Sequence, residues 1–203
     1  MQVLFEAIAA GDGATASQLL ARSPDLALAR ADVGATRHNP VPFFLKGAQC
    51  YVYEGMTALH AAAATYSVAL VEQLVALGAV VRARTRRGAQ PLHYAASGGP
   101  GSALWDPESQ AATVWALVRA GADLEAVDLG GITPLHRAVR CRCAAAVEAL
   151  LEAGSDPSHL SKRGTTTVQT PTTTKGTGGA GSPAAKKQNS EILELFRRRG
   201  LLA

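Results

Sequence analysis

The phrase GITPLHRA at residues 131–138 recurs in two other forms, GMTALHAA at 55–62 and GAQPLHYA at 88–95. The glycines that open these phrases are separated by 33 and then 43 residues. A second glycine series follows apolar pairs, with separations of 43 and then 33 residues, and consists of Gly78, Gly121 and Gly154. A period of 33 residues, lengthened once by ten, indicates a repeat architecture.

Each unit has the pattern of a helix, a tight turn and a second helix. Thr133 is a suitable N-cap, and Pro134 follows at the first helical position, where its missing N–H has no partner to lose. Leu135 and Ala138 share one face of this short helix. Gly154 ends the second helix in a left-handed conformation. The apolar stripe of that helix is formed by Val147, Leu150 and Leu151. No unit buries its stripe alone, so neighbouring units must stack.

These phrases resemble the ankyrin repeat, which has a period of 33 residues and the signature T-P-L-H-x-A. The matching runs are 57–62, 90–95 and 133–138. The resemblance implies an all-α solenoid of stacked helix-turn-helix units, joined by β-hairpin-like fingers, with about four to five repeats.

The repeat phase divides a single domain, 1–203, into units. The first unit lacks the TPLH phrase but keeps the residue types at Leu4, Ala7, Leu20 and Asp25. We expect an N-terminal capping repeat at 2–33, an inserted finger at 34–54, repeats at 55–87, 88–130 and 131–163, and a divergent C-terminal capping repeat at 164–203.

One histidine recurs at the same place in each internal unit, as His60, His93 and His136. In the family that the chain resembles, this side chain bonds within its turn and to the neighbouring repeat. Histidines that lie one full repeat apart do not converge on one metal ion. We therefore predict structural histidines and no metal or cofactor site.

The inserted finger contains ATRHNPVPFFLKGAQCYVYE at 35–54 and holds four aromatic residues, Phe43, Phe44, Tyr51 and Tyr53. VPFFL and QCYVY are expected to pair as short strands across Lys46-Gly47. Two interpretations remain open: the finger covers the apolar side of the cap, or it presents its aromatic residues to a partner. The stretch also resembles an insertion found in bacterial ankyrin proteins, which implies no particular activity.

Two further insertions interrupt the array. The loop at 97–109 ends in Asp106-Pro107-Glu108, a helix start, and its Trp105 is expected to pack the loop against that helix rather than to serve as an exposed anchor. The loop at 170–182 contains GTGGAG at 176–181, which matches a phosphate-binding pattern but lacks a preceding strand, and we expect a simple loop. The threonine-rich run at 165–171 leaves the first helix of the last unit in doubt.

The net charge, the cysteine spacing and the motif content limit the functions that the sequence can support. The formal net charge is +4, and the three cysteines, Cys50, Cys141 and Cys143, lack the spacing of a zinc or redox motif. We expect reduced thiols, no signal peptide, no membrane span and a cytoplasmic protein. No catalytic motif assembles along the sequence, so we predict that the chain is not an enzyme.

The resemblance implies a protein–protein interaction module, such as an adaptor, an inhibitor or an immunity-type protein, that binds through finger tips and a concave face. The finger tips also offer Arg84. The candidate contact residues are Phe43, Phe44, Tyr51, Tyr53, Arg86, Arg87, Tyr94, Trp105, Arg137 and Arg140. Their charge favours an acidic protein partner over nucleic acid, and we expect a monomer. The alternative is an enzyme or small-molecule binder whose pocket, between 35–54 and the concave face, includes Phe43.

Overall fold

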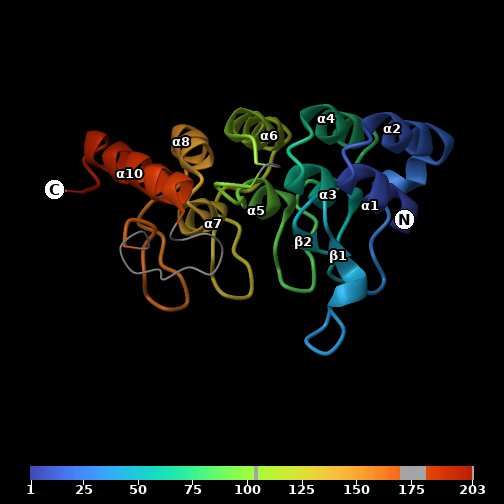
Figure 1. Ribbon diagram of the computed structural model, residues 1–203, viewed down its shortest axis with the longest axis horizontal. Helices are drawn as coiled ribbons and strands as arrows, with labels where there is room; N and C mark the ends of the chain where they lie inside the picture. Colours follow the sequence, from blue (N-terminus) through green and yellow to red (C-terminus); the bar gives the residue numbers. More distant parts are fainter. Residues whose placement is uncertain (103–104, 170–181, 203) are drawn as a thin grey trace.

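Two rows of antiparallel helices form a curved stack, with the two chain ends at opposite ends (Figure 1). The structure is a computed structural model that describes residues 1–102, 105–169 and 182–202. The inner row contains α1 (Gln2–Ala9), α3 (Ala58–Ala64), α5 (Pro91–Ala95) and α7 (Pro134–Cys141). The outer row contains α2 (Gly13–Arg22), α4 (Val68–Ala76), α6 (Pro107–Arg119), α8 (Ala144–Glu152) and α10 (Pro183–Arg198). The predicted all-α solenoid is confirmed.

The helices begin where short polar side chains satisfy their first N–H groups. The Thr133 hydroxyl accepts a hydrogen bond from the His136 N–H at 3.3 Å, and the Asp106 carboxylate accepts from the Glu108 N–H at 3.0 Å. Ser182 caps α10, and a proline occupies the first position of all three helices. The predicted starts at Thr133 and Asp106 are confirmed because capping depends on local residues only.

The glycine that opens each phrase is required by its backbone. Gly131 has φ +69°, and a Cβ atom there would lie 2.7 Å from the backbone nitrogen of Lys162 in the next finger. Both the left-handed conformation and the close approach exclude larger residues. Gly154 ends α8 with φ +100°, as predicted.

Small apolar residues let the rows pack closely. The alanines of α3 are buried up to Ala63, and Leu59, Leu92 and Leu135 have no exposed surface. An alanine side chain loses no rotamer freedom on burial, so an alanine-rich interface brings the inner helices together at low entropic cost.

Fingers hang from the inner row and are joined edge to edge. The Arg86 N–H donates to the Glu54 carbonyl at 2.8 Å, and the Leu129 N–H donates to the Arg87 carbonyl at 2.9 Å. Arg84 donates side-chain hydrogen bonds to the carbonyls of Gly88 and Val127. The guanidinium of Arg84 therefore joins two fingers while its side chain stays exposed.

Three buried histidines fasten each repeat to the next. Each Nε2 lies within hydrogen-bonding distance of a carbonyl oxygen in the following unit. The pairs are His60 with Ala89 at 3.2 Å, His93 with Ile132 at 2.9 Å and His136 with Thr165 at 3.2 Å. Because a carbonyl oxygen only accepts, Nε2 must carry the proton.

The other ring nitrogen, Nδ1, completes the fastening within its own turn. At His60 it accepts from the Thr57 N–H at 3.2 Å and from the Thr57 hydroxyl at 2.9 Å. Burial lowers the pKa of His60 to about 3 and that of His93 to about 4. Burial also lowers the pKa of His136. All three rings are therefore neutral at pH 7, which fits the predicted structural role.

The last unit departs from the pattern in the way its threonines suggest. Residues 167–169 form a turn, and no helix begins within the described residues 165–169. Thr167 is buried, and its hydroxyl donates to the Pro157 carbonyl at 2.6 Å. The GTGGAG run and most of the 170–182 loop lie outside the described residues. The stack is closed by α10, which buries Ile192, Leu195 and Phe196.

Acidification is expected to destabilise the stack through these histidines. The pKa values of His60 and His93 are lower in the folded chain than the unfolded value near 6.5, so the unfolded state binds more protons below that pH. The free energy of unfolding should fall by on the order of 2 kcal/mol for each of the two histidines between pH 7 and pH 5. Urea denaturation across this range measures the slope.

His93→Gln should give a shallower slope than the parent chain, whatever its own stability. His38→Gln serves as the control, since His38 is exposed, and it should leave the slope unchanged. An equal slope in the parent chain and in His93→Gln would contradict the assignment.

Candidate partner-binding groove

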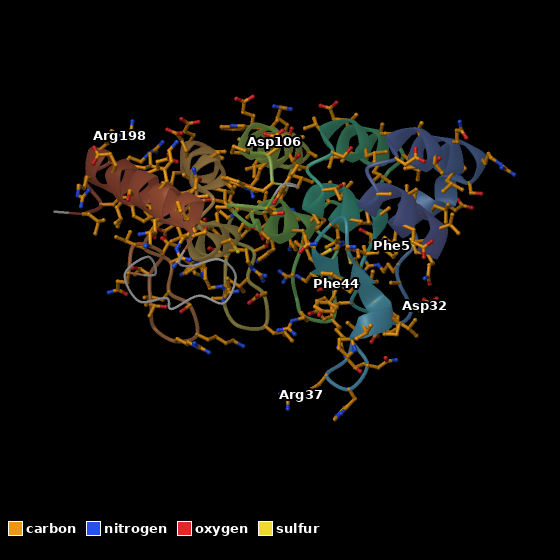
Figure 2. All side chains as sticks on the ribbon, in the orientation of Figure 1. Phe5, Asp32, Arg37, Phe44, Asp106 and Arg198 are labelled. Atoms are coloured by element: carbon orange, nitrogen blue, oxygen red, sulfur yellow. The ribbon has the colours of Figure 1, made fainter. Side chains whose placement is uncertain are left out.

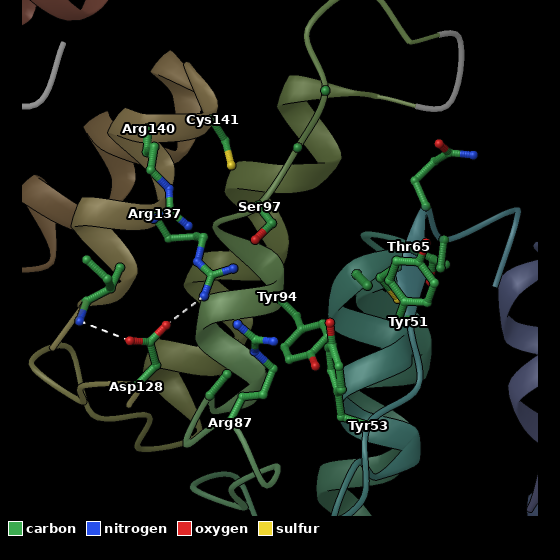
Figure 3. A pocket seen from close by; sticks show the side chains of 18 of the residues that line it. Tyr51, Tyr53, Thr65, Arg87, Tyr94, Ser97, Asp128, Arg137, Arg140 and Cys141 are labelled. Atoms are coloured by element: carbon green, nitrogen blue, oxygen red, sulfur yellow. Dashed lines mark hydrogen bonds and ion pairs between the residues drawn. The ribbon is translucent and has the colours of Figure 1, made fainter. Parts of the chain in front are cut away.

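A groove of about 1470 Å³ runs along the inner helices on the finger side of the molecule (Figure 3). The C-terminal ends of α1, α3, α5 and α7 form its floor. The fingers and the inserted segment form its walls. Eight predicted contact residues line it, namely Tyr51, Tyr53, Arg86, Arg87, Tyr94, Trp105, Arg137 and Arg140.

The inserted segment folds into a small hairpin that forms one wall. After a short 3₁₀ turn, η2 (Val41–Phe43), strand β1 (Phe44–Leu45) pairs antiparallel with β2 (Cys50–Tyr51). Phe44 lies opposite Tyr51, and Leu45 lies opposite Cys50. The predicted pairing of VPFFL with QCYVY is therefore present.

The two faces of this hairpin have different roles. Leu45, Ala48 and Val52 are buried in the hydrophobic core, whereas Phe44 and Tyr51 are 39% and 37% exposed. The rings of Phe44 and Tyr51 contact each other, with centroids 4.9 Å apart. The hairpin thus covers part of the cap with one face and carries exposed aromatic rings on the other, so both interpretations of the insertion describe part of the geometry.

Phe43 and Phe44 do not line the groove. Phe43 is half-buried and packs against the core, while Phe44 extends outward below the stack (Figure 2). The expectation that Phe43 lines a pocket between the insertion and the concave face is therefore wrong. Phe43 ends the 3₁₀ turn η2, before β1 begins, and its side chain packs against the core instead of the groove.

A glycine at the hairpin turn allows the hairpin to dock on α1. A Cβ atom at Gly47 would overlap the carbonyl oxygen of Ala9. The turn itself is closed by Gln49, whose side-chain amide donates to the Lys46 carbonyl at 2.6 Å. The backbone of the hairpin therefore rests directly on the end of the first inner helix.

Tyr53 links the insertion to the next finger. The guanidinium groups of Arg86 and Arg87 lie over its ring, 5.9 Å and 5.2 Å from the centroid. Arg86 also donates a hydrogen bond to the Ala35 carbonyl. These contacts hold the hairpin against the array at a second point, away from α1.

Tyrosines form the middle of the floor. The ring of Tyr94 meets the ring of His60 edge-on, with centroids 5.1 Å apart. Burial raises the pKa of Tyr94 and of Tyr66. The Tyr66 hydroxyl donates to the Ser97 carbonyl of the next unit. Tyr66 was not predicted as a site residue. Its place in the turn between two helices was readable from the repeat phase.

The arginines of α7 differ in their surroundings. Arg137 forms an ion pair with Asp128, with the nitrogen and oxygen 2.9 Å apart and both side chains largely buried. Asp128 also accepts hydrogen bonds from the N–H groups of Gly130 and Ile132. Arg140 is exposed, and no ion pair to it is present among the described residues.

The lining of this groove carries a net positive charge. The described lining includes five arginines and a single carboxylate, that of Asp128. The lining therefore has an excess of four positive charges. An excess of one sign in a concave surface raises the local concentration of ligands of opposite charge.

Trp105 fastens the second insertion, as predicted. Its indole N–H donates to Gln110 at 2.9 Å, and the Gln110 amide donates to the carbonyls of Ala95 and Ser97. The ring also contacts Gly98, where a Cβ atom would lie 2.9 Å away. Trp105 is half-buried and forms one end of the groove wall.

The described residues show no cluster suited to metal binding, and two of the three thiols are held protonated. No group of three potential metal ligands occurs within them. Burial raises the pKa of the Cys50 thiol to about 12 and also raises that of Cys143, so neither is a thiolate at pH 7. Among the described helices, none combines the length and hydrophobicity that a membrane span requires.

Comparison with known protein families identifies the family of this chain. A model of three consecutive ankyrin repeats matches residues 4–105, and a model of a single ankyrin repeat matches residues 130–162. The chain belongs to the ankyrin repeat family. The unmatched interval, 106–129, contains α6 and follows the loop that lengthens the middle ankyrin repeat. Ankyrin repeats are protein–protein interaction modules, and the family is typically non-enzymatic. No curated protein matches the chain.

Gly47→Ala is expected to undock the hairpin from the first ankyrin repeat. The added methyl group would overlap the Ala9 carbonyl, and overpacking of this kind costs about 1–3 kcal/mol. Urea denaturation should show the loss, and limited trypsin digestion should show faster cleavage after Lys46.

Gly13→Ala is the matched control, because a Cβ atom at Gly13 meets nothing within 4 Å and the residue opens α2. It should leave the cleavage rate unchanged and slightly raise the stability. Similar behaviour of the two variants would show that the hairpin does not rest on α1.

Proposed function

We propose that this chain is a non-enzymatic interaction module, an adaptor, inhibitor or immunity-type protein, that binds a protein partner in the groove. The observation that carries the proposal is the meeting of exposed arginines and tyrosines on one concave surface. Arginine and tyrosine are the residue types most often found at energetically dominant positions of protein interfaces.

The size of the groove also supports a polypeptide ligand. Pockets for small molecules enclose about 300–1,000 Å³ and bury most of the ligand surface. This groove is larger, about 1470 Å³, and extends over four inner helices. A macromolecular segment fits such an elongated surface better than a compact metabolite does.

The chemistry of the lining argues against catalysis. The lining histidine, His136, donates Nε2–H to a carbonyl and receives a hydrogen bond at Nδ1 from the Thr133 hydroxyl, so neither nitrogen is free to accept a substrate proton. The lining thiol of highest burial, Cys50, is protonated. A pocket for an enzyme substrate beneath the hairpin is the weaker alternative.

Photo-crosslinking from inside the groove tests the proposal. Benzoylphenylalanine in place of Tyr51 keeps an aromatic ring at an exposed lining position. In extracts of the source cell, we expect a discrete protein adduct, identified by mass spectrometry, that protease removes and nuclease does not.

The control carries the same photo-crosslinker at Glu72. This side chain lies on the outer row, in α4, and is 62% exposed. It should give no such adduct. Equal adducts from both positions, or none from Tyr51, would remove the groove as the binding surface.

A further inference from the structure

The arginines of the groove are not equally available to a ligand. Arg137 is neutralised by Asp128 at 2.9 Å, and Arg86 is bonded to the Ala35 carbonyl. Both therefore hold the groove in shape. Within the described residues, the guanidinium groups of Arg87, Arg140 and Arg163 have no carboxylate partner, and all three side chains are exposed.

These available arginines occupy separate parts of the groove. Arg87 projects from the finger before α5, Arg140 lies near the end of α7, and Arg163 lies in the finger that follows α8. Figure 3 shows Arg87 beside Tyr94 and Tyr53, with Arg140 further along the floor beside Cys141. Arg87 also lies over the Tyr53 ring, whereas no ring contact or ion pair involves Arg140 among the described residues.

The rings themselves are poorly placed for stacking nucleic acid bases. The Tyr53 ring is flanked by Arg86 and Arg87, the Tyr51 ring contacts Phe44 and the Tyr94 ring contacts His60. Single-stranded nucleic acids bind proteins largely by stacking on free aromatic faces. The tilted contact of Tyr51 and the edge-on contact of Tyr94 still leave part of each ring for an apolar side chain. The guanidinium groups favour carboxylates as the anionic groups of the ligand.

The length of the groove defines the size of the segment. Packed helices lie about 8–10 Å apart, so the three spacings between the four inner helices extend over about 30 Å. An extended chain rises about 3.3 Å per residue, which corresponds to about nine residues. A segment rich in like charges repels itself and favours the extended form.

We propose that the groove takes an extended acidic segment of about nine residues from the protein partner, with its carboxylates on Arg87 and Arg140 and its apolar side chains against Tyr51 and Tyr94. This inference rests on the proposed function and specifies the chemistry of the partner. Arg137 acts as a positioning residue. Its ion pair holds Asp128, which in turn bonds the finger at Gly130 and Ile132.

Fluorescence anisotropy with synthetic ligands tests the proposal on the full chain. The probe is a fluorescein-labelled decapeptide of sequence EELEEFEELE. The comparison ligands are KKLKKFKKLK and a ten-nucleotide oligothymidine with the same label. We expect the acidic peptide to bind more tightly than both comparison ligands, with an affinity that falls as salt is raised, because the paired charges are solvent-accessible.

The variant Arg140→Gln should weaken binding of the acidic peptide by about threefold or more, since the change removes a charge-assisted hydrogen bond. Arg198→Gln is the matched control. This arginine lies in the last turn of α10, is exposed and is remote from the groove (Figure 2), and its loss should change the affinity by less than about twofold. Circular dichroism confirms that each variant is folded.

Three outcomes would overturn the acidic segment. These are equal or tighter binding of the lysine peptide or the oligonucleotide, equal binding by Arg140→Gln, and no binding of the acidic peptide. If a groove-dependent protein adduct still forms at Tyr51, the interaction module stands and only the acidic segment fails. If neither the adduct nor peptide binding is found, both proposals fail.

Discussion

Three buried imidazoles join neighbouring ankyrin repeats, each donating a hydrogen bond from Nε2 to a carbonyl of the next unit. A buried donor without a partner costs about 1–3 kcal/mol, so the position of each repeat is tied to its neighbour by the need to satisfy this bond. The same burial keeps the rings neutral. A protonated ring would lose its acceptor nitrogen and carry charge into an apolar interface.

The groove is a consequence of this fixed stacking. With the inner helices held in register, residues one repeat apart in sequence, such as Tyr94 and Arg137, come to lie on the same concave surface. The hairpin adds a wall that the repeats alone would lack. Gly47 allows its backbone to rest on α1, and Tyr53 ties it to the next finger through two arginines.

The ion pairs on the helix surfaces differ from the ion pair in the groove in how far their side chains are buried. Most ion pairs of the described residues lie on exposed helix surfaces, where they contribute little to stability. The Arg137–Asp128 pair is different, because both side chains are largely buried and Asp128 also bonds the finger backbone. Of the two arginines of α7, Arg137 therefore stabilises the finger through Asp128, whereas Arg140 is exposed to solvent.

The sequence by itself determined the repeat, the helix starts and the structural histidines. These depend on local rules, in which a cap, a proline or a left-handed glycine acts within a few residues. It also predicted the hairpin pairing and eight of the residues that meet in the groove. Only the tertiary structure decided that Phe43 turns inward, that Tyr66 bonds the next unit, and which arginines are already paired. Those outcomes depend on contacts between segments that are far apart in the chain. The spacing of residues along the sequence does not determine such contacts.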